Sequence, residues 1–295
     1  MQLLPWHHQS SAGFALGGWH SPPSGKPLLH FLHGNGFCTR SYEPMLRLLA
    51  EHFDLWLCDL QGHGESEHGG PFLGWNRNAE LALEAFEAGR EPFAEVPRFA
   101  CGHSFGGVLT SLMLASHPGL FERAVLLDPV LFPLSLIQLR TSLSLLGMRR
   151  NPMAESAKAR RHHWPDRETA FGALHERGIF RGWEAAAFQA HIEHALTDHH
   201  EHGVELKCRP SREAEVFESM PKRLWPALKR VRTPTLLVHG DKTYPFVAQS
   251  ARRLAAINTQ VSVSSLPGGH CFMQQDAARS AERVRGFLLD SDDGA

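Results

Sequence analysis

Short apolar runs alternate with segments of helical spacing along the first part of the chain. From Pro27, the apolar run PLLHFLH is followed by an amphipathic stretch, residues 41–52, and then by a second run, DLWLCD. The same order recurs through residues 74–89, the run RFAC, residues 104–117 and the run RAVLLD. Strands that alternate with helices form βαβ units, so the pattern predicts an α/β fold with a mostly parallel sheet flanked by helices.

The alternation stops after Pro133 and resumes with the apolar runs TPTLLVHG and QVSVSSL. The intervening segment contains helical patches, such as WEAAAFQAHIEHALTDHH, and no apolar strand run. We therefore expect an α/β core formed by residues 1–131 and 229–295. Residues 132–228 are predicted to form a helical cap, or lid, inserted between the sixth and seventh core strands.

A serine stands between glycines at the predicted junction of a strand and a helix. In ACGHSFGGV, Gly102 and Gly106 lie two residues before and two residues after Ser104. A serine on such a turn is strained and holds its hydroxyl above the sheet, and the close passage of the chain excludes side chains at both flanking positions. The following helix directs its N-terminal amides toward the space where an oxyanion would form. The pentapeptide alone also fits a glycine-rich turn with a capping serine.

Three further glycine-containing segments follow predicted strands. HGNGF begins at His33, DLQGHGES begins at Asp59, and LPGGHCF begins at Leu266. Together with GHSFG, and in this order, they resemble the α/β-hydrolase superfamily, specifically its lidded serine hydrolases of the esterase and lipase type. The resemblance extends from about residue 27 to the end of the chain and implies the α/β-hydrolase fold.

The resemblance also implies a mechanism. It makes Ser104 the nucleophile and His270, in the loop after the last strand, the base that takes its proton. The backbone amides of Asn35 and Phe105 would form the oxyanion hole. Relatives that open epoxides or remove halide carry aspartate at the nucleophile position, so a serine favours acyl transfer to water. We therefore expect a cofactor-independent carboxylesterase that works through an acyl-enzyme.

The acid of the catalytic triad departs from the family pattern. Relatives usually carry an aspartate three residues after the glycine that ends the seventh strand, and that position is Thr243 here. Two aspartates can substitute, Asp241 in the same loop and Asp128 at the end of the sixth strand in AVLLDPV. Some superfamily members place the acid after that neighbouring strand, which ends beside the serine turn. We predict Asp128 and keep Asp241 as the alternative.

Other activities fit the same resemblance. A carbon–carbon bond hydrolase of ring-cleavage products uses the same triad and a similar cap, and cofactor-free lyases and oxygenases share the fold. A ligand-binding relative without catalysis is a further alternative. A dinucleotide-binding interpretation of GNGFCT is not favoured, because Thr39 stands where the third glycine of GxGxxG belongs.

The predicted cap carries aromatic, basic and histidine-rich segments. The basic cluster between Met148 and Trp164 is interpreted as solvated helix, with an arginine that binds an acidic substrate group as the alternative. His191 and His194 have a spacing that suits zinc, but no HExxH motif occurs, and we predict no metal site. Five aromatic residues are predicted to line an apolar cleft over Ser104, or alternatively to form the core of the cap: Trp164, Phe171, Phe180, Trp183 and Phe188.

Composition narrows the range of partners. The formal net charge is −1, so no overall field attracts nucleic acid or an anionic membrane. The N-terminus MQLLPWHHQS is unlike a signal peptide, and no run reaches the roughly 18 apolar residues of a membrane span. The five cysteines include no CxxC pair, which indicates reduced thiols. We expect a cytoplasmic protein that acts on a small, apolar ester; no pattern in the chain predicts its oligomeric state.

Overall fold

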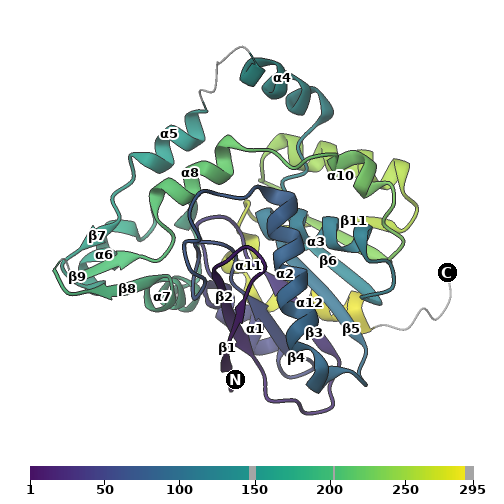
Figure 1. The fold of residues 1–295 in the computed structure, drawn as a ribbon, viewed down its shortest axis with the longest axis horizontal. Coiled ribbons are helices and arrows are strands. Elements are labelled where there is room, and N and C mark those ends of the chain that lie inside the picture. Colours follow the sequence, from purple (N-terminus) through teal and green to yellow (C-terminus); the bar gives the residue numbers. More distant parts are fainter. Residues whose placement is uncertain (146–150, 202, 290–295) are drawn as a thin grey trace.

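An eight-stranded sheet runs through the centre of the molecule (Figure 1). The computed structural model describes residues 1–145, 151–201 and 203–289. Six neighbouring strands, from β4 to β11, are parallel, and β1 and β2 add an antiparallel pair at one edge. The predicted mostly parallel sheet is therefore confirmed. In spatial order the strands are β1 (Leu4–Gln9), β2 (Ala15–His20), β4 (Asp54–Cys58), β3 (Leu28–Leu32), β5 (Arg98–His103), β6 (Arg123–Leu127), β10 (Thr235–Gly240) and β11 (Val261–Leu266).

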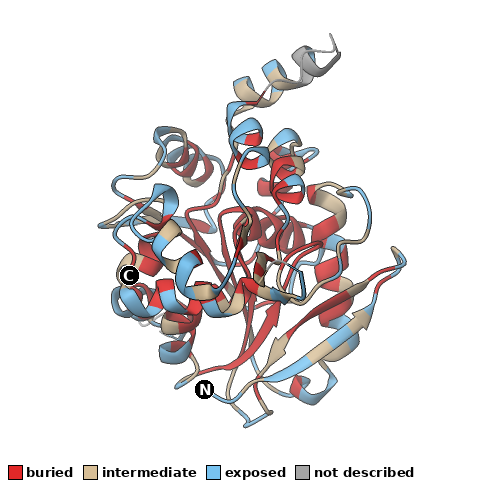
Figure 2. Ribbon diagram, turned by 90° about the vertical axis from the view of Figure 1, so that its left-hand side faces the viewer, coloured by how far each residue is buried: buried red, intermediate tan, exposed pale blue. Residues whose placement is uncertain are grey.

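The central strands are buried on both faces, as Figure 2 shows by their red colour. Along β3, Leu28 and Leu32 pack into the hydrophobic cluster on one face of the sheet, whereas Leu29 and Phe31 pack into the cluster on the other. Successive side chains of a strand point to opposite faces, so only a continuous apolar run can fill both clusters. This requirement is why PLLHFLH and RFAC form central strands.

Helices cover both faces of the sheet. The cluster on the first face includes buried residues of α2, α3 and α10, and the cluster on the second face includes those of α1, α11 and α12. Of the helices in the described ranges, none is long and apolar enough to cross a membrane. The bounds are α1 (Glu43–Leu49), α2 (Trp75–Gly89), α3 (Ser104–Ser116), α10 (Pro245–Ile257), α11 (Phe272–Gln275) and α12 (Ala277–Leu289), with short 3₁₀ helices η1 (Thr39–Tyr42) and η2 (Glu91–Phe93).

The segment between β6 and β10 is not purely helical, so this part of the prediction is wrong. It contains a separate three-stranded antiparallel sheet in the order β7–β9–β8. In these short strands buried residues alternate with polar ones, as Leu196 and Thr197 do, and they carry no apolar run. The elements are α4 (Leu134–Leu145), α5 (Pro152–Lys158), β7 (His163–Trp164), α6 (Arg167–Leu174), η3 (Gly178–Phe180), α7 (Ala185–His194), β8 (Leu196–His199), β9 (Gly203–Leu206), α8 (Pro210–Glu218) and α9 (Leu224–Leu228).

The start of α3 passes very close to the end of β3. The backbone N–H of Gly106 donates to the carbonyl oxygen of His33 at 3.0 Å. A methyl group on Gly106 would lie 2.5 Å from that oxygen and still closer to the carbonyl oxygen of Leu32. Because both obstacles are backbone atoms, the strand or the helix would have to move to admit a side chain.

Gly106→Ala is therefore expected to lower the free energy of unfolding by about 1–3 kcal/mol, the usual cost of overpacking. Urea unfolding followed by circular dichroism measures the change. The matched control is Gly172→Ala in α6, where an added methyl group meets no atom within 4 Å. That variant should be as stable as the wild type or more stable by up to about 1 kcal/mol. Equal unfolding midpoints for both variants would contradict the close approach.

Candidate active site

Ser104 lies at the first position of α3, directly after β5. Its backbone φ is 52°, in the left-handed region that residues with a side chain rarely adopt. The turn is tight, because a methyl group on Gly102 would lie 2.6 Å from the carbonyl oxygen of Gly106. The structure thus has the strained strand-to-helix turn that the sequence predicts.

His270 joins Ser104 to an aspartate. Its Nε2 lies 2.8 Å from Ser104 Oγ, and its Nδ1 lies 2.5 Å from Asp128 Oδ2. A neutral imidazole with its proton on Nδ1 satisfies both contacts, since it donates to the carboxylate and accepts from the serine hydroxyl. His270 is therefore oriented to take the hydroxyl proton of Ser104.

Asp128 follows β6 and is completely buried. Its backbone φ is 43°, so a second left-handed residue lies at the end of a strand next to β5. Its carboxylate accepts hydrogen bonds from Gly240 N at 2.9 Å, from the Thr243 hydroxyl and from His270. A buried carboxylate is tolerable only when its oxygens are satisfied in this way.

Thr243, at the position where relatives carry the acid, supports the acid instead of replacing it. Thr243 donates to Asp128, so this side chain, which our sequence analysis gave no role, supports the carboxylate on the neighbouring strand. Asp241 is exposed, and its Oδ1 accepts a hydrogen bond from Gly268 N at 2.8 Å. Of the two candidate acids, the structure therefore brings Asp128, and not Asp241, against His270.

Both residues predicted to form the oxyanion hole lie beside Ser104. Asn35 and Phe105 line the same cavity as Ser104 and His270. Phe105 is in the first turn of α3, where backbone N–H groups have no partner within the helix.

The loop that carries Asn35 is held by two neighbours that the sequence analysis missed. Gly36 N donates to His63 Nε2 at 3.1 Å, and Asn35 Nδ2 donates to the Glu213 carbonyl oxygen at 3.0 Å. Burial lowers the pKa of His63 well below its usual value, so the ring is neutral and its Nε2 is free to accept. The motif DLQGHGES, in which His63 lies, was the only available signal for it.

A chain of hydrogen bonds connects the three loops of the site. Gly34 N donates to Tyr42 Oη at 2.9 Å, and Tyr42 Oη lies 2.6 Å from His103 Nδ1. His103 Nε2 lies 3.0 Å from the backbone carbonyl oxygen of His270. Burial holds the pKa of His103 well below its usual value, so the neutral ring accepts from the tyrosine hydroxyl and donates to that carbonyl. His103 thus ties the loop of His270 to the serine turn.

The cavity over Ser104 has a mainly apolar lining. Phe132 and Phe246 stack on one side of it, with ring centroids 6.1 Å apart, and Tyr244 continues the stack toward His270. The other hydrophobic lining residues are Phe37, Trp75, Phe105, Val130, Leu136, Met153, Ile179, Val216 and Phe217.

The five aromatic residues predicted to line this cavity are absent from its lining, and that prediction is wrong. Phe180 packs against Phe188 with ring centroids 5.4 Å apart, and Phe171 packs against Phe188 at 4.8 Å. Trp164 and Trp183 are buried in the same hydrophobic cluster. These side chains pack α6, η3 and α7 against each other and against the core. The alternative interpretation, that the five residues form the core of the cap, therefore fits better.

Of the described basic side chains in the cluster that was predicted to be solvated, Arg160 reaches the cavity. Met148 to Arg150 lie outside the described residues. Arg160 lines the cavity, and its Nη2 lies 2.9 Å from Glu213 Oε2.

The histidines considered as zinc ligands have other partners. His191 Nδ1 lies 3.0 Å from Ser41 Oγ, and burial lowers the pKa of this histidine to about 3. His194 Nε2 lies 3.1 Å from Glu43 Oε2. Across the described parts of the chain, no group of three or more histidine, cysteine, aspartate or glutamate side chains is arranged to hold a metal ion.

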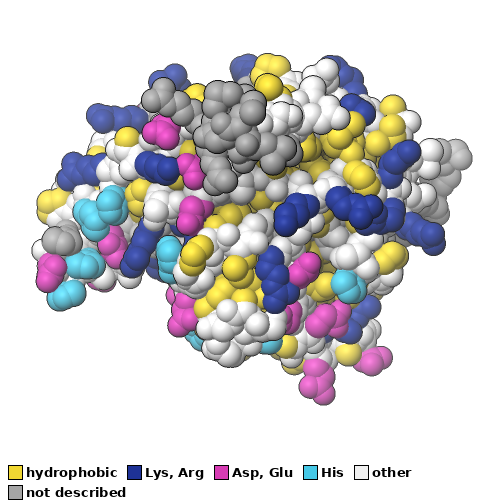
Figure 3. Space-filling model, turned by 45° about the horizontal axis from the view of Figure 1, so that its top comes forward, with side chains coloured by type: hydrophobic (Ala, Val, Ile, Leu, Met, Phe, Trp, Pro, Cys, Tyr) yellow, Lys and Arg dark blue, Asp and Glu magenta, His cyan; other side chains and the backbone are white. Residues whose placement is uncertain are grey.

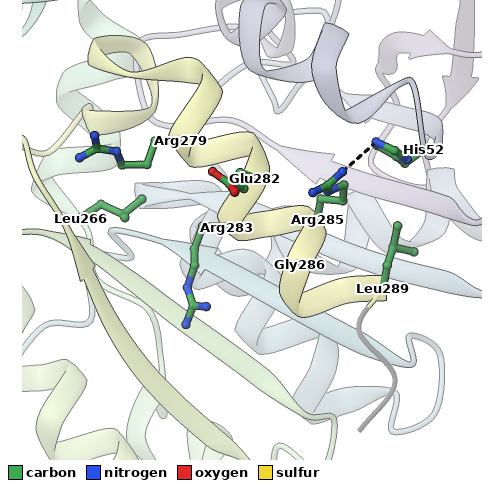
Figure 4. Close-up of a pocket in the computed structure, with 8 residues that line it drawn as sticks. All are labelled: His52, Leu266, Arg279, Glu282, Arg283, Arg285, Gly286 and Leu289. Carbon is green, nitrogen blue, oxygen red and sulfur yellow. Dashed lines mark hydrogen bonds between the residues drawn. The ribbon is translucent and has the colours of Figure 1, made fainter. Parts of the chain in front are cut away.

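A second hollow, on α12, is lined by basic side chains (Figure 4). Arg279 pairs with Asp276, with Nε and Oδ2 3.2 Å apart, and Arg285 donates to His52 Nε2 at 3.3 Å. The hollow shares no lining residue with the cavity over Ser104, so it is separate from the candidate active site.

Comparison with known proteins identifies one family for this chain. A profile described as "Alpha/beta hydrolase family" matches residues 31–283. The chain is 30% identical over 115 residues to a monoglyceride lipase of Homo sapiens, a match that covers 38% of this chain and 38% of the lipase. It is 27% identical over 169 residues to a type I acyl-CoA thioesterase of Penicillium roqueforti, which covers 52% of this chain and 36% of the thioesterase. The matches thus span well under two thirds of either relative.

A solved structure matches over the whole chain. A peroxisomal alpha-beta-hydrolase from Saccharomyces cerevisiae superposes with a TM-score of 0.78 at 18% sequence identity. The superposition covers 100% of this chain and 91% of that chain. At this identity the likeness concerns the fold.

The cysteines near the site are expected to be unreactive in the folded protein. Burial raises the pKa of the Cys38 thiol to about 12, and burial raises the pKa of the other four thiols as well. Because the thiolate is the reactive form, iodoacetamide at pH 8 should modify native protein at least about 100-fold more slowly than protein in guanidinium. Peptide mass spectrometry measures both rates. Rapid modification of a native thiol would contradict this expectation. The five buried cysteines are Cys38, Cys58, Cys101, Cys208 and Cys271.

Proposed function

The chain belongs to the alpha/beta hydrolase family, and within that family we propose that it is a serine hydrolase that cleaves a carboxylic ester through an acyl-enzyme. It has the fold predicted for that family. The observation that carries the proposal is the continuous hydrogen-bonded line from Ser104 through His270 to Asp128. The distant relatives that act on esters and thioesters by name, a lipase and a thioesterase, agree with this class of reaction.

In the proposed first half-reaction, Ser104 Oγ attacks the ester carbonyl carbon while His270 Nε2 takes the hydroxyl proton. Asp128 keeps the imidazole in the correct tautomer and stabilises the imidazolium that forms. The backbone N–H groups of Asn35 and Phe105 donate to the oxyanion. Collapse of the tetrahedral intermediate transfers the proton from His270 to the departing alcohol and leaves the acyl group on Ser104.

In the second half-reaction, water takes the place of the alcohol. His270 Nε2 removes a proton from the water as it attacks the acyl carbonyl carbon, and the same two N–H groups stabilise the second oxyanion. The proton then returns to Ser104 Oγ, which releases the carboxylic acid. No cofactor takes part in this proposed sequence.

The cavity supports a small, largely apolar substrate. Its volume of about 190 Å³ is below the usual range of roughly 300–1,000 Å³ for ligand pockets. Residues 132–228 are proposed to act as the cap, because this segment contributes several lining side chains, among them Leu136, Met153 and Phe217.

Ser104→Ala tests the nucleophile. We expect it to abolish hydrolysis of p-nitrophenyl esters across a series of acyl lengths, and to leave the unfolding midpoint close to that of the wild type because the hydroxyl contributes little packing. A fluorophosphonate probe should label the wild type on Ser104. Including a vinylogous diketone and an acyl thioester in the substrate panel separates the carbon–carbon hydrolase and thioesterase alternatives. Labelling at another residue, or full activity of the variant, would refute the assignment.

Replacing each aspartate in turn tests the acid. Asp128→Asn is expected to lower kcat by about 10⁴-fold, because an amide favours the wrong histidine tautomer. Asp241→Asn is the matched control in the neighbouring loop and should lower kcat by less than about tenfold, since the exposed carboxylate accepts only a local hydrogen bond. The opposite ranking of the two kcat values would show that Asp241 is the acid.

A further inference from the structure

The wall of the cavity formed by α4 changes from apolar to cationic along the helix. Phe132, Leu136 and Arg140 all line the cavity and follow one another at intervals of four residues. Leu136 and Arg140 lie within α4, where residues four apart share one face and are separated by about 6 Å along the axis. The guanidinium therefore comes one helical turn after the apolar part of this wall.

The other cation in the cavity already has a counter-ion. Arg160 pairs with Glu213, which is buried, so this pair contributes no net charge. Burial raises the pKa of Glu213, and the positive charge of Arg160 opposes that rise. Two arginines are among the described residues that line the cavity, and Arg140 is the one that is not paired with a carboxylate.

Within the ranges that the structure describes, the guanidinium of Arg140 has no hydrogen bond or ion pair. The acidic side chain that acts on it electrostatically is Glu218, and Glu218 accepts a hydrogen bond from Lys158 Nζ at 2.5 Å. Burial lowers the pKa of Arg140, as expected for a cation that loses water without gaining a partner. Figure 3 shows one face of the molecule, on which hydrophobic side chains lie next to groups of lysine and arginine side chains.

We propose that the cavity over Ser104 binds an ester whose acyl chain ends in a carboxylate, and that Arg140 recognises this carboxylate. The inference rests on the proposed function and names its substrate class, a monoester of a dicarboxylic acid. The apolar lining would hold the methylene chain, with the scissile carbonyl at Ser104 and the carboxylate at Arg140. Arginine suits this role because its planar guanidinium donates two parallel hydrogen bonds to a carboxylate, and the pairing supplies the missing counter-ion.

Matched pairs of esters test the proposal. Monomethyl adipate is compared with methyl hexanoate, and monomethyl suberate with methyl octanoate, by following acid release at constant pH. The measured quantity is the ratio of kcat/KM for the anionic ester to that for the neutral ester of equal length. We expect the ratio to exceed one in the wild type for at least one pair.

Arg140→Gln is expected to lower this ratio by about tenfold, the usual loss for a charged hydrogen-bonded pair that is partly exposed to water. Arg140→Lys should give an intermediate ratio, because a lysine keeps the charge without the planar fork. The matched control is Arg252→Gln, an exposed arginine on α10, which should keep the wild-type ratio. A wild-type ratio below one for both pairs, or an unchanged ratio in Arg140→Gln, would overturn the proposal.

Two further measurements do not depend on turnover by a variant. Raising sodium chloride from 25 to 500 mM should lower the wild-type ratio, because salt screens a partly exposed charge pair. Titration calorimetry with Ser104→Ala, which leaves the esters intact, should show tighter binding of monomethyl adipate or monomethyl suberate than of methyl hexanoate or methyl octanoate. If no ester is hydrolysed and no probe labels Ser104, the proposed function fails, yet the calorimetry still decides the substrate class. Equal or weaker binding of the anionic esters would refute the role of Arg140.

Discussion

Two adjacent parallel strands, β5 and β6, each lead into a residue with a left-handed backbone. Ser104 has a φ of 52° and Asp128 has a φ of 43°, and each such conformation costs about 1–3 kcal/mol. The surrounding structure enforces both. Gly102 and Gly106 allow the chain to close the serine turn, and three hydrogen-bond donors hold the carboxylate. The position of the His270 ring between Ser104 and Asp128 depends on these two turns.

The buried charge of Asp128 ties the second half of the sheet to the site. Its donors are Gly240 at the end of β10, Thr243 in the loop that follows, and His270 in the loop after β11. His103 fixes the same loop from the other side through the His270 carbonyl. His270 is therefore held at both its ring and its backbone, which is the preorganisation that the proposed proton transfer at Ser104 requires.

The sequence predicted those features that short-range patterns determine. Continuous apolar runs identified the central strands, and the glycines around Ser104 identified the turn, because sterics leave few alternatives there. The lining of the cavity was mispredicted, since it depends on which of many aromatic side chains are already used in packing: Phe180 and Phe188 pack together, whereas Phe132 and Phe246 face the cavity. The strands β7 to β9 were missed because they are short and partly polar.

The account rests on the claim that Ser104 carries the acyl group during turnover. The most direct test is to quench the wild-type enzyme in acid within milliseconds of mixing with an ester, and to measure the intact mass and the modified peptide. The account predicts a mass increase equal to the acyl group, located on Ser104, together with a burst of released alcohol of about one equivalent per enzyme. A burst without any adduct, or an adduct on a different residue, would contradict it.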